Sequence, residues 1–457
     1  MSRHAVVIGG SLAGLCAARA LVDHVDQVTV VDRDRFPDVP TVRSGVPQAH
    51  HLHVLVTAGQ RALDGLFPGL VTELYEAGAV VVDTPTDVLY LTATGWRERF
   101  AATHRLVGTS RELLDWTVRN RLAADPRVRF LPAHEAMELI GADGRDAVTG
   151  VVVRPRGSAG ALQQRLTADL VVDASGRGSR TPQWLARLGY GEPQQTRVDS
   201  GLSYASRRYV LAPNAVEGWK NIVLMPEPPH TGRGAVLYPI EGGRWMVTLG
   251  GLGGDRPPTD EAGFLEFARE MRSPLLYEAI KNAIPDSAIH GFRGTANHRR
   301  HYETMPRWPD GFLVVGDAAC TFNPVYGQGM SVAARNAVVL GAHLRRHGGR
   351  FGRAVQARVA RCSDAPWRIA TGADLRYPST VGPRPRGGAL ARWYLDRMAD
   401  VANRDPYVCE VLTDVLHLVA PLSAVVRPTV VARVLRGRPG PRLDAPAPTA
   451  SPGTGPS

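Results

Sequence analysis

The sequence predicts an α/β fold with an α+β second domain. Short apolar strands lead into glycine-rich turns and helical patterns near residues 6–14 and 313–329, whereas residues 88–100 and 182–290 hold strands joined by tight turns. Strands of a parallel sheet that is covered on both faces read as continuous apolar runs, and hairpins belong to antiparallel sheets. We therefore predict a parallel sheet, a discontinuous antiparallel sheet and a group of C-terminal helices.

The N-terminal unit reads as a strand, a tight turn and a helix. Val6–Ile8 is fully apolar, and residues 12–22 combine small and apolar residues at helical spacing. Gly9 permits the turn, and Gly14 allows the helix to pack closely on the strand. The unpaired N–H groups and positive dipole end of such a helix suit a pyrophosphate. This unit predicts a site for the diphosphate of a dinucleotide.

The next strand, 28–31, ends at an acidic residue. Asp32 follows Gly14 by eighteen residues, and a carboxylate at this position can accept hydrogen bonds from ribose hydroxyls. Ser11 stands where the usual fingerprint has its middle glycine. We assign Asp32, Arg33 and Ser11 to the ligand site of a Rossmann-like domain.

A second motif occupies residues 311–330. The strand 313–315 is followed by Asp317, at the strand end where ligands bind in open α/β sheets. The helix that follows begins in a glycine-rich turn, so its N–H groups and dipole can face an electron-rich ring edge. We assign Asp317 to ribityl hydroxyls and this turn to the flavin ring, through Pro324, Gly327, Gly329 and Met330. Together the two motifs predict one FAD, held by its ADP half at the first and by its ribityl-flavin half at the second.

Length and composition limit the other classes of function. A chain of 457 residues is expected to form two or three domains. No apolar run reaches the roughly 18 residues that a membrane span needs, and no signal-peptide pattern is recognisable, so we expect a cytoplasmic protein without a membrane span. The four cysteines lie far apart without a CxxC pair, which suits a reducing compartment and indicates no local metal site.

The net charge of +11 raises the question of nucleic acid binding. Only two residues are lysines, and the arginines are scattered without interleaved aromatic residues. A basic stripe that follows a phosphate backbone is missing, so we predict no nucleic acid partner. Weak attraction to anionic substrates or acidic carrier proteins stays open.

The remaining elements follow from periodicity and turn residues. Helices are expected at 54–66, 110–122, 261–283 and 329–345, and over most of 346–436; strands are expected at 80–83, 128–131, 148–154, 170–172, 207–211, 221–226, 234–240 and 244–250, with a hairpin at 88–100. We predict an FAD-binding domain from residues 1–80, 101–181 and 291–345. The substrate-binding domain would comprise 81–100 and 182–290, followed by a helical region at 346–436 and a disordered tail at 437–457.

Three motifs together resemble those of a known enzyme class. The Gly9–Gly14 turn, the string Asp173-Ala-Ser-Gly-Arg-Gly-Ser-Arg180 and Asp317 with its Pro-x-x-Gly-x-Gly tail resemble the FAD motifs of flavoprotein monooxygenases with the para-hydroxybenzoate hydroxylase fold, over residues 1–345. By this resemblance Arg111 contacts the FAD phosphate or ribityl region, and Asp173 lies near the cofactor channel. The hydroxylases normally read Asp-Gly at Asp173, so no nicotinamide-binding role is implied for this segment.

Further strings resemble a narrower group. Gly45-Val-Pro-Gln48 with the histidines after it, Phe67-Pro-Gly69 and the segment that begins at Ser110 resemble the flavin epoxidases of bacterial polyether ionophore biosynthesis, of the lasalocid and monensin type. The implied chemistry is oxygen transfer from a flavin C4a-hydroperoxide to an alkene of a large apolar polyketide or terpenoid. Such a step uses FAD, O2 and electrons from NAD(P)H or a separate flavin reductase. It needs no protein nucleophile or metal, so we predict no catalytic side chain.

Other functions stay open beside epoxidation. They are aromatic hydroxylation, saturation of isoprenoid double bonds by a flavin reductase, and ligand binding by a non-catalytic flavoprotein. We assign the substrate pocket to residues on predicted strands of the second domain, with plain core packing as the alternative for each: Leu224, Tyr238, Trp245 and Met246.

Several polar residues near position 50 have more than one interpretation. His50, His51 and His53 are more typical of loop hydrogen bonding or flavin-edge contacts than of a metal site, since no cysteine or carboxylate cluster accompanies them. Arg43 is assigned to the cofactor site, where it would gate the flavin or bind an acidic group of the substrate. An ordinary exposed arginine is the alternative.

Overall fold

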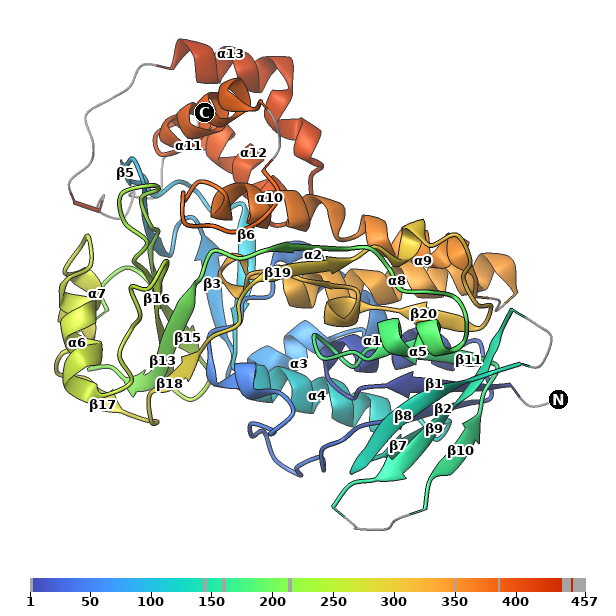
Figure 1. Cartoon of the computed structure of the whole chain (residues 1–457). Coiled ribbons are helices and arrows are strands. Elements are labelled where there is room, and N and C mark those ends of the chain that lie inside the picture. The colour runs from blue at the N-terminus through green and yellow to red at the C-terminus, as the bar shows by residue number, and fades with distance from the viewer. Residues whose placement is uncertain are drawn as a thin grey trace, which may run out of the picture.

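The computed structural model describes residues 3–142, 146–157, 162–212, 216–348, 351–384, 387–437 and 445–446. It confirms the predicted α/β fold with its α+β part. Figure 1 shows a parallel sheet with long helices on one side of the molecule, an antiparallel sheet on the other, and the helices α11–α13 at one end. The tail predicted at 437–457 lies outside the described residues, apart from 437, 445 and 446.

The parallel sheet has the strand order β20-β11-β1-β2-β7. Its strands are β1 (His4–Ile8), β2 (Gln27–Val31), β7 (Val128–Leu131), β11 (Leu170–Asp173) and β20 (Phe312–Val314). The side chains of β1 alternate between two cores, because successive residues of a strand point to opposite faces. Val7 joins the core under the helices, and Val6 joins the core on the other face.

Helices cover one face of this sheet. They are α1 (Leu12–Val22), α2 (Thr57–Leu66), α3 (Leu70–Glu76), α4 (Arg111–Ala123), α8 (Gly329–His347) and α9 (Arg353–Arg361). The helix expected at 54–66 starts three residues later, after the short 3-10 helix Pro47–His50. Helix α4 begins as predicted, because the Ser110 hydroxyl accepts from the Leu113 N–H at 3.1 Å as its N-cap.

The opposite face is covered mainly by a small antiparallel sheet. It has the order β10-β9-β8, with β8 (His134–Gly141), β9 (Val148–Pro155) and β10 (Gln164–Thr167), and the helix α5 (Thr181–Arg187) lies beside it. The predicted strand at 148–154 therefore belongs to this covering sheet and not to the parallel one. The reason is that β9 follows β8 directly and pairs with it in the antiparallel sense, as consecutive strands of a hairpin do.

The large antiparallel sheet contains the strands of both predicted excursions. Its order is β17-β13-β16-β15-β14-β4-β5, with β18 beside β13, and β4 pairs with β14 in parallel across more than 120 residues of chain. The strands are β4 (Val88–Thr92), β5 (Gly95–Trp96), β13 (Ser203–Val210), β14 (Asn221–Leu224), β15 (Gly234–Ile240), β16 (Arg244–Gly251), β17 (Ile284–Pro285) and β18 (His290–Phe292). The hairpin predicted at 88–100 is therefore present, but its second strand ends at Trp96.

The two faces of this sheet have different neighbours. On one face lie α6 (Glu261–Arg269) and α7 (Leu275–Ile280), with Phe264 and Leu276 fully buried. The single helix predicted at 261–283 is divided here, because Pro274 cannot continue a helix and instead precedes α7 as its N-cap residue. On the other face lie residues 52–54 and the two-stranded sheet β3 (Val80–Thr84) and β6 (His104–Gly108). This second face is the one directed toward the predicted cofactor domain.

The remaining strands and helices complete the molecule. A three-stranded sheet has the order β12-β19-β21, with β12 (Gln195–Val198), β19 (Asn297–Arg300) and β21 (Cys320–Thr321). The C-terminal helices are α10 (Asp364–Asp374), α11 (Ala389–Ala402), α12 (Pro406–Leu416) and α13 (Pro428–Arg436), of which the last three share a core of their own. The predicted domain limits stay a proposal.

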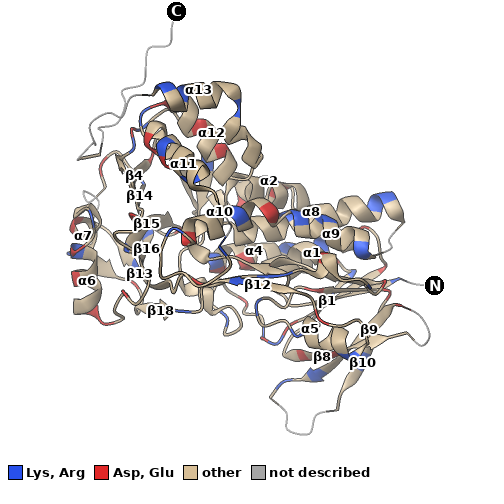
Figure 2. Ribbon diagram, turned by 45° about the horizontal axis from the view of Figure 1, so that its top comes forward, with Lys and Arg blue, Asp and Glu red and all other residues tan. Residues whose placement is uncertain are grey.

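Charge and hydropathy of the described residues agree with a folded core and a mixed surface. Figure 2 shows Lys and Arg interspersed with Asp and Glu over all parts of the molecule. In the part of the chain that the structure describes, no helix is long and apolar enough to cross a membrane.

Candidate cofactor and substrate site

The turn between β1 and α1 has the close packing that its glycines allow. Gly9 has a φ of +105°, and a Cβ there would lie 2.5 Å from the carbonyl oxygen of Ala174. A Cβ on Gly14 would lie 1.8 Å from the carbonyl oxygen of Gly9. Only a residue without a side chain fits either position. The N-terminal end of α1 is therefore held against the ends of β1 and β11.

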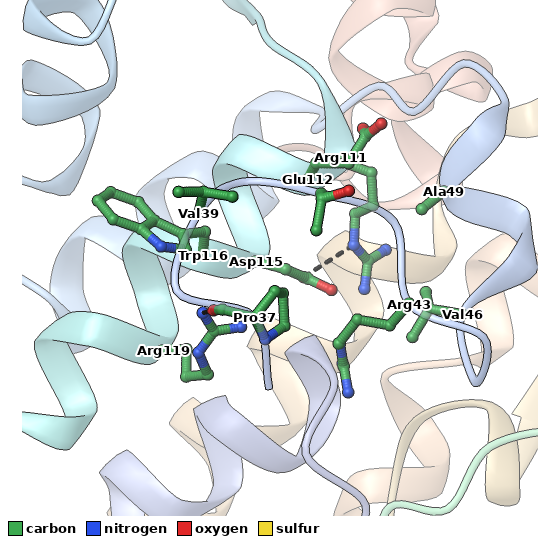
Figure 3. A pocket seen from close by; sticks show the side chains of 11 residues that line it. Pro37, Val39, Arg43, Val46, Ala49, Arg111, Glu112, Asp115, Trp116 and Arg119 are labelled. Carbon is green, nitrogen blue, oxygen red and sulfur yellow. Dashed lines mark hydrogen bonds and ion pairs between the residues drawn. The ribbon is translucent and has the colours of Figure 1, made fainter. Parts of the chain in front are cut away.

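A buried arginine lies at this helix end. Arg111 on α4 donates from Nη2 to the Ser11 hydroxyl at 2.9 Å and from Nε to Asp115 at 2.8 Å, and Figure 3 shows this ion pair. Ser11, the N-cap residue of α1, makes no side-chain cap bond. The arrangement places a guanidinium beside the N-terminal end of a helix, and both groups attract phosphate oxygens.

The carboxylate of Asp32 organises the adjoining loop. It accepts from the N–H of Gly10 at 2.5 Å and from the N–H of Asp34 at 2.8 Å. The Nη1 of Arg43 lies 3.5 Å from the carboxylates of Asp32 and Asp34. Its Nη2 donates to the Gly10 carbonyl at 3.1 Å. Its Nη1 is buried yet has no hydrogen-bond partner among the described residues. An orphaned buried donor of this kind fits an acceptor on a ligand.

The two predicted arginines of this loop differ in their burial. Arg33 is exposed, and its guanidinium donates to the Gly45 carbonyl at 3.3 Å, at the rim of the loop. Arg43 is 8% exposed, so the alternative of an ordinary surface arginine is wrong.

Asp317 lies beyond the end of β20, in the short 3-10 helix Gly316–Ala318. Burial raises the pKa of its carboxyl, against the opposing fields of Arg177, Arg111 and Arg300. In the described part of the chain its carboxylate has no hydrogen-bond partner, and a Cβ on Gly329 would lie 3.9 Å from its Oδ1. An acceptor without protein donors, at the start of α8, suits hydroxyl groups of a ligand.

The turn before α8 is built on a short 3-10 helix, Pro324–Tyr326, followed by Gly327 with a φ of +65°. Pro324 is exposed, and Gly329 is the first residue of α8. The Met330 side chain is buried in the core under the helices, so it directs only its main chain toward the turn.

The surroundings of Asp173 give it a structural role. Its carboxylate is fully buried and accepts from the Ser175 N–H at 2.9 Å and from the hydroxyls of Ser179 and Thr181 at 2.5 Å each. Asp173 therefore shapes the turn that ends at Thr181 and lies against Gly9. Its contact with a cofactor stays a prediction.

The substrate residues predicted from strand positions divide between the two faces of the large sheet. Tyr238 and Met246 are register partners and lie on the face toward β3, β6 and residues 52–54. Leu224 and Trp245 lie on the other face, in the core with α6 and α7. Core packing is therefore the correct interpretation for Leu224 and Trp245, since they face α6 and α7 and the sheet itself separates them from the predicted cofactor domain.

A series of hydrogen-bonded, buried side chains crosses the face that carries Met246. His51 contacts the Ser206 hydroxyl through Nδ1 at 2.8 Å, and that hydroxyl lies 2.7 Å from Thr248 Oγ1. The His51 ring also packs edge-on against Tyr204 at 4.6 Å and against Phe292 at 5.5 Å. Burial lowers the pKa of His51 to about 3, so its imidazole is neutral at pH 7.

The neighbouring histidines show the loop contacts that the sequence favoured over a metal site. His50 stacks on His290 at 3.8 Å, and His53 contacts the His51 carbonyl at 3.0 Å through Nδ1. Burial lowers the pKa of His53 to about 3. Among the described residues no group of three or more His, Cys, Asp or Glu side chains could hold a metal ion.

Two cavities adjoin these groups. The one in Figure 3 is small and is lined by residues of α4 and of the loop 37–49, including Arg43, Arg111 and Arg119. The other has a volume of about 550 Å³ and lies between residues 40–50 and the strand β13, with Arg208 and His290 on its wall. Both open beside Arg43, at the junction of the two sheets.

Sequence analysis missed some charged residues of the site. Asp115 and Arg119 follow the predicted Arg111 at i+4 and i+8 on α4, and this spacing could have revealed the face that lines the cavity. Arg177 stands inside the Asp173–Arg180 string, yet nothing in the string indicates its proximity to Asp317, which depends on the pairing of β11 with β20.

These residues fit the two ends of an FAD molecule. The close-packed glycine turn, the orphaned Nη1 of Arg43 and the guanidinium of Arg111 suit the diphosphate, and the free acceptor of Asp317 suits the ribityl chain. A Cβ on Gly316, beside Asp317, would lie 2.8 Å from the Cβ of Ala13 in α1. The two motifs, about 300 residues apart in the sequence, therefore meet in one site.

Comparison with known proteins agrees with this fit. Residues 3–350 match the family model described as FAD binding domain. The chain is 32% identical over 430 residues to Protein Rv3254 of Mycobacterium tuberculosis (strain ATCC 25618 / H37Rv), covering 89% of this chain and 88% of that protein. It is 28% identical over 356 residues to kynurenine 3-monooxygenase of Salinispora arenicola (strain CNS-205), covering 75% of this chain and 72% of that protein.

Solved structures with little sequence identity share the fold. A flavoprotein/dehydrogenase from Cytophaga hutchinsonii has a TM-score of 0.66 at 14% identity, over 94% of this chain and 95% of that chain. The p-nitrophenol 4-monooxygenase PnpA from Pseudomonas putida DLL-E4 has a TM-score of 0.63 at 16% identity, over 91% of this chain and 98% of that chain. The chain thus belongs to the family described as FAD binding domain, and it shares the fold of solved flavoproteins that include p-nitrophenol 4-monooxygenase.

Proposed function

We propose that this flavin-dependent monooxygenase epoxidises an alkene of a large, mostly apolar polyketide or terpenoid. When bound and reduced, FAD activates O2 and supplies an electrophilic oxygen atom, with electrons from NAD(P)H or from a separate flavin reductase. The protein's own task is then to bind and orient the substrate, exclude water and hold the cofactor.

The observation that carries this proposal is the apolar face of the large sheet. Tyr238 and Met246 are buried there, and the partly buried side chains of Tyr90, Val223 and Val236 pack around the same core. Ser206 and Thr248 on this face are neutral and bonded to one another, and the charge of Arg208, the register partner of Met246, is paired with Glu112 at 3.1 Å. An apolar wall gains free energy from covering an apolar substrate, by about 25 cal/mol for each Å² removed from water.

The buried histidines support an alkene over a phenol. Hydroxylation of a phenol gains from a base whose pKa lies near the working pH, whereas an alkene needs no deprotonation. The imidazoles of His51 and His53 each have a pKa lowered to about 3 by burial, so both are weak bases. In this proposal they donate or accept hydrogen bonds and carry no proton away from the substrate.

The proposed cofactor contacts come from both motifs. On the ADP side Gly9 and Gly14 shape the turn, and polar groups follow around it: Ser11, Asp32, Arg43 and Arg111, with Arg33 at the rim. On the flavin side Asp317 accepts from ribityl hydroxyls. The main chain of the turn before α8 faces the ring through Pro324, Gly327, Gly329 and Met330, where the N–H groups and dipole of α8 stabilise negative charge on the reduced ring.

Aromatic hydroxylation is the second candidate. It is favoured by the similarity to kynurenine 3-monooxygenase and by the fold shared with p-nitrophenol 4-monooxygenase, since kynurenine and p-nitrophenol are aromatic compounds.

Labelled oxygen distinguishes these candidates. The purified protein with FAD, reduced and then mixed with 18O2, is given a trisubstituted terpenoid olefin in one reaction and a phenol of similar size in another. Epoxide carrying one 18O atom is the expected product. Label taken from water, or turnover of the phenol alone, contradicts epoxidation. Saturation of the olefin without O2 would instead support the flavin-reductase alternative.

A further inference from the structure

The C-terminal helical region reaches the turn before α8 through a buried carboxylate. Asp374, the last residue of α10, is 2% exposed. Its Oδ1 accepts from the Tyr326 hydroxyl at 2.9 Å and from Asn323 Nδ2 at 3.0 Å, and its Oδ2 accepts from Asn297 Nδ2 at 2.6 Å. Two of these donors, Asn323 and Tyr326, border or belong to the 3-10 helix of the turn.

The same side chains shape the backbone of the turn. The Asn323 side-chain oxygen accepts from the N–H of Val325 at 3.2 Å, and the N–H of Asn323 donates to Asn297 Oδ1 at 2.8 Å. Asn297 and Asn323 are 0% and 1% exposed, so water cannot replace these bonds. The orientation of Asn323, and with it the start of the turn, therefore depends on the acceptor that Asp374 provides.

A second contact from the C-terminal region holds the other end of the turn. Gln328 donates from Nε2 to the Leu416 carbonyl at 3.0 Å, and its side chain is 2% exposed. Gly329, the first residue of α8, follows directly. Residues 374 and 416 thus bracket the six residues from 323 to 328, although the family match ends at residue 350.

The surroundings of Asp374 bear on the charge of its carboxyl. All of its side-chain contacts in the described part of the chain are donated by neutral groups, which favour the ionised carboxylate, whereas burial raises the pKa of the carboxyl. Burying a charge without a cation is costly, and apolar packing would hold a turn with less loss of hydration energy. A negative charge that hydrogen-bonds to the turn through Tyr326 also acts on whatever the turn binds.

We propose that Asp374 is a positioning residue for FAD, which holds the turn from Asn323 to Gln328 in the shape that receives the isoalloxazine ring. The proposal rests on the placement of the flavin at this turn. It does not depend on which substrate is oxygenated. The cofactor site is then completed by the C-terminal helices, beyond the part of the chain that the family model describes.

The test compares three variants of the full chain. Asp374→Asn keeps the size of the side chain but sets an amide N–H against the donors of Asn297 or Asn323. Tyr326→Phe removes one hydroxyl and leaves the core intact. Asp396→Asn is the matched control, because Asp396 lies in the same region with its side chain 49% exposed in an ion pair with Arg376.

Four quantities are measured: the Kd for FAD of the apoprotein, the visible flavin spectrum, the midpoint potential of the bound flavin and the melting temperature of the apoprotein. Asp374→Asn is expected to raise the Kd at least tenfold and to make the potential more positive, because a negative charge near the flavin opposes its reduction. Tyr326→Phe is expected to raise the Kd severalfold and shift the spectrum at an unchanged melting temperature. Asp396→Asn should match the native protein in all four.

Native values of Kd, spectrum and potential in both Asp374→Asn and Tyr326→Phe would overturn the proposal. If Asp374→Asn does not fold, Tyr326→Phe decides alone by the same criteria. Failure of the native protein to bind FAD would instead overturn the cofactor assignment. A native protein that binds FAD but leaves olefins unchanged would overturn only epoxidation.

Discussion

The carbonyl oxygen of Gly9 lies so near to Gly14 that a Cβ on Gly14 would sit 1.8 Å from it. No contact of this length is sterically possible, so helix α1 approaches the end of β1 only because residue 14 has no side chain. The position of the helix end, and of the N–H groups proposed to bind the diphosphate, therefore depends on this one residue.

We expect Gly14→Ala to lower the free energy of unfolding by about 3 kcal/mol or more, since the clash is with backbone. The control is Gly65→Ala in α2, where no atom lies within 4 Å of the added Cβ; it should stabilise the protein by about 0.5–1 kcal/mol. Urea denaturation of both variants measures the difference. Equal stability of the two would contradict the close packing.

Asp317→Ala is expected to weaken FAD binding by about 1–3 kcal/mol, or roughly five- to 150-fold in Kd, because the ribityl hydroxyls lose a buried acceptor. The control is Asp23→Ala, which removes an exposed carboxylate paired with Arg19. Titration of each apoprotein with FAD, followed by flavin fluorescence, gives the constants. An unchanged Kd in Asp317→Ala would remove this residue from the proposed site.

Stability should fall as the pH is lowered below about 6.5, in part because of His51. Its pKa is about 3 in the folded protein, against an ordinary value of 6.5. Between these values the unfolded chain binds a proton that the folded chain does not, so the free energy of unfolding decreases with falling pH. Between pH 7 and pH 5 the contribution reaches about 2 kcal/mol at most.

The check is His51→Gln, which retains a polar group near Ser206 but cannot be protonated. Chemical denaturation at pH 7 and pH 5 should show a smaller loss of stability in this variant than in the native protein. His417, whose pKa burial also lowers to about 3, remains in both proteins and contributes equally. Parallel losses in the two proteins would show that His51 is not held neutral by burial.

Two neighbours on β16 should differ in their effect on substrate. Met246→Ala alters the apolar face opposite the helices, so we expect a severalfold weaker binding of the olefin substrate at an unchanged Kd for FAD. Trp245→Ala removes a side chain that packs with Trp219 against α6 and α7. It should lower the free energy of unfolding by about 2–4 kcal/mol and leave substrate affinity unchanged. If only Trp245→Ala weakened substrate binding, the pocket would lie on the face that packs against α6 and α7, and the proposed location would be wrong.

Local patterns in the sequence determined the elements that carry the cofactor motifs. The apolar run Val6–Ile8, the glycines that follow it and the small and apolar residues at helical spacing over 12–22 require only neighbouring residues to specify a strand, a turn and a helix. The same holds for Asp317, which any chain with this strand and turn would place at the carboxyl end of a sheet. For this reason the predicted α/β fold and the predicted FAD cofactor agree with the structure and the family match.

The sequence assigned Trp245 and Met246 to one pocket, although neighbours on a strand point to opposite faces, and it did not indicate which face meets the cofactor domain. That choice was decided by the packing of α6 and α7 on one side and of residues 52–54 on the other. Likewise, the local sequence does not distinguish Asp173 from Asp317, because each aspartate follows a strand. The donors that surround it distinguish a carboxylate occupied by its own turn from one free for a ligand.

Contacts between distant residues were decided by tertiary structure alone. Arg111 meets Ser11 across 100 residues, and Asp374 meets Tyr326 across 48, because α4 and α10 each pack beside a turn that precedes another helix. Hydrogen bonds act over about 3 Å, so they exist only after the whole chain has brought their partners together. A single sequence specifies the local elements through short-range sterics and periodicity, whereas the site is completed by contacts that no local pattern contains.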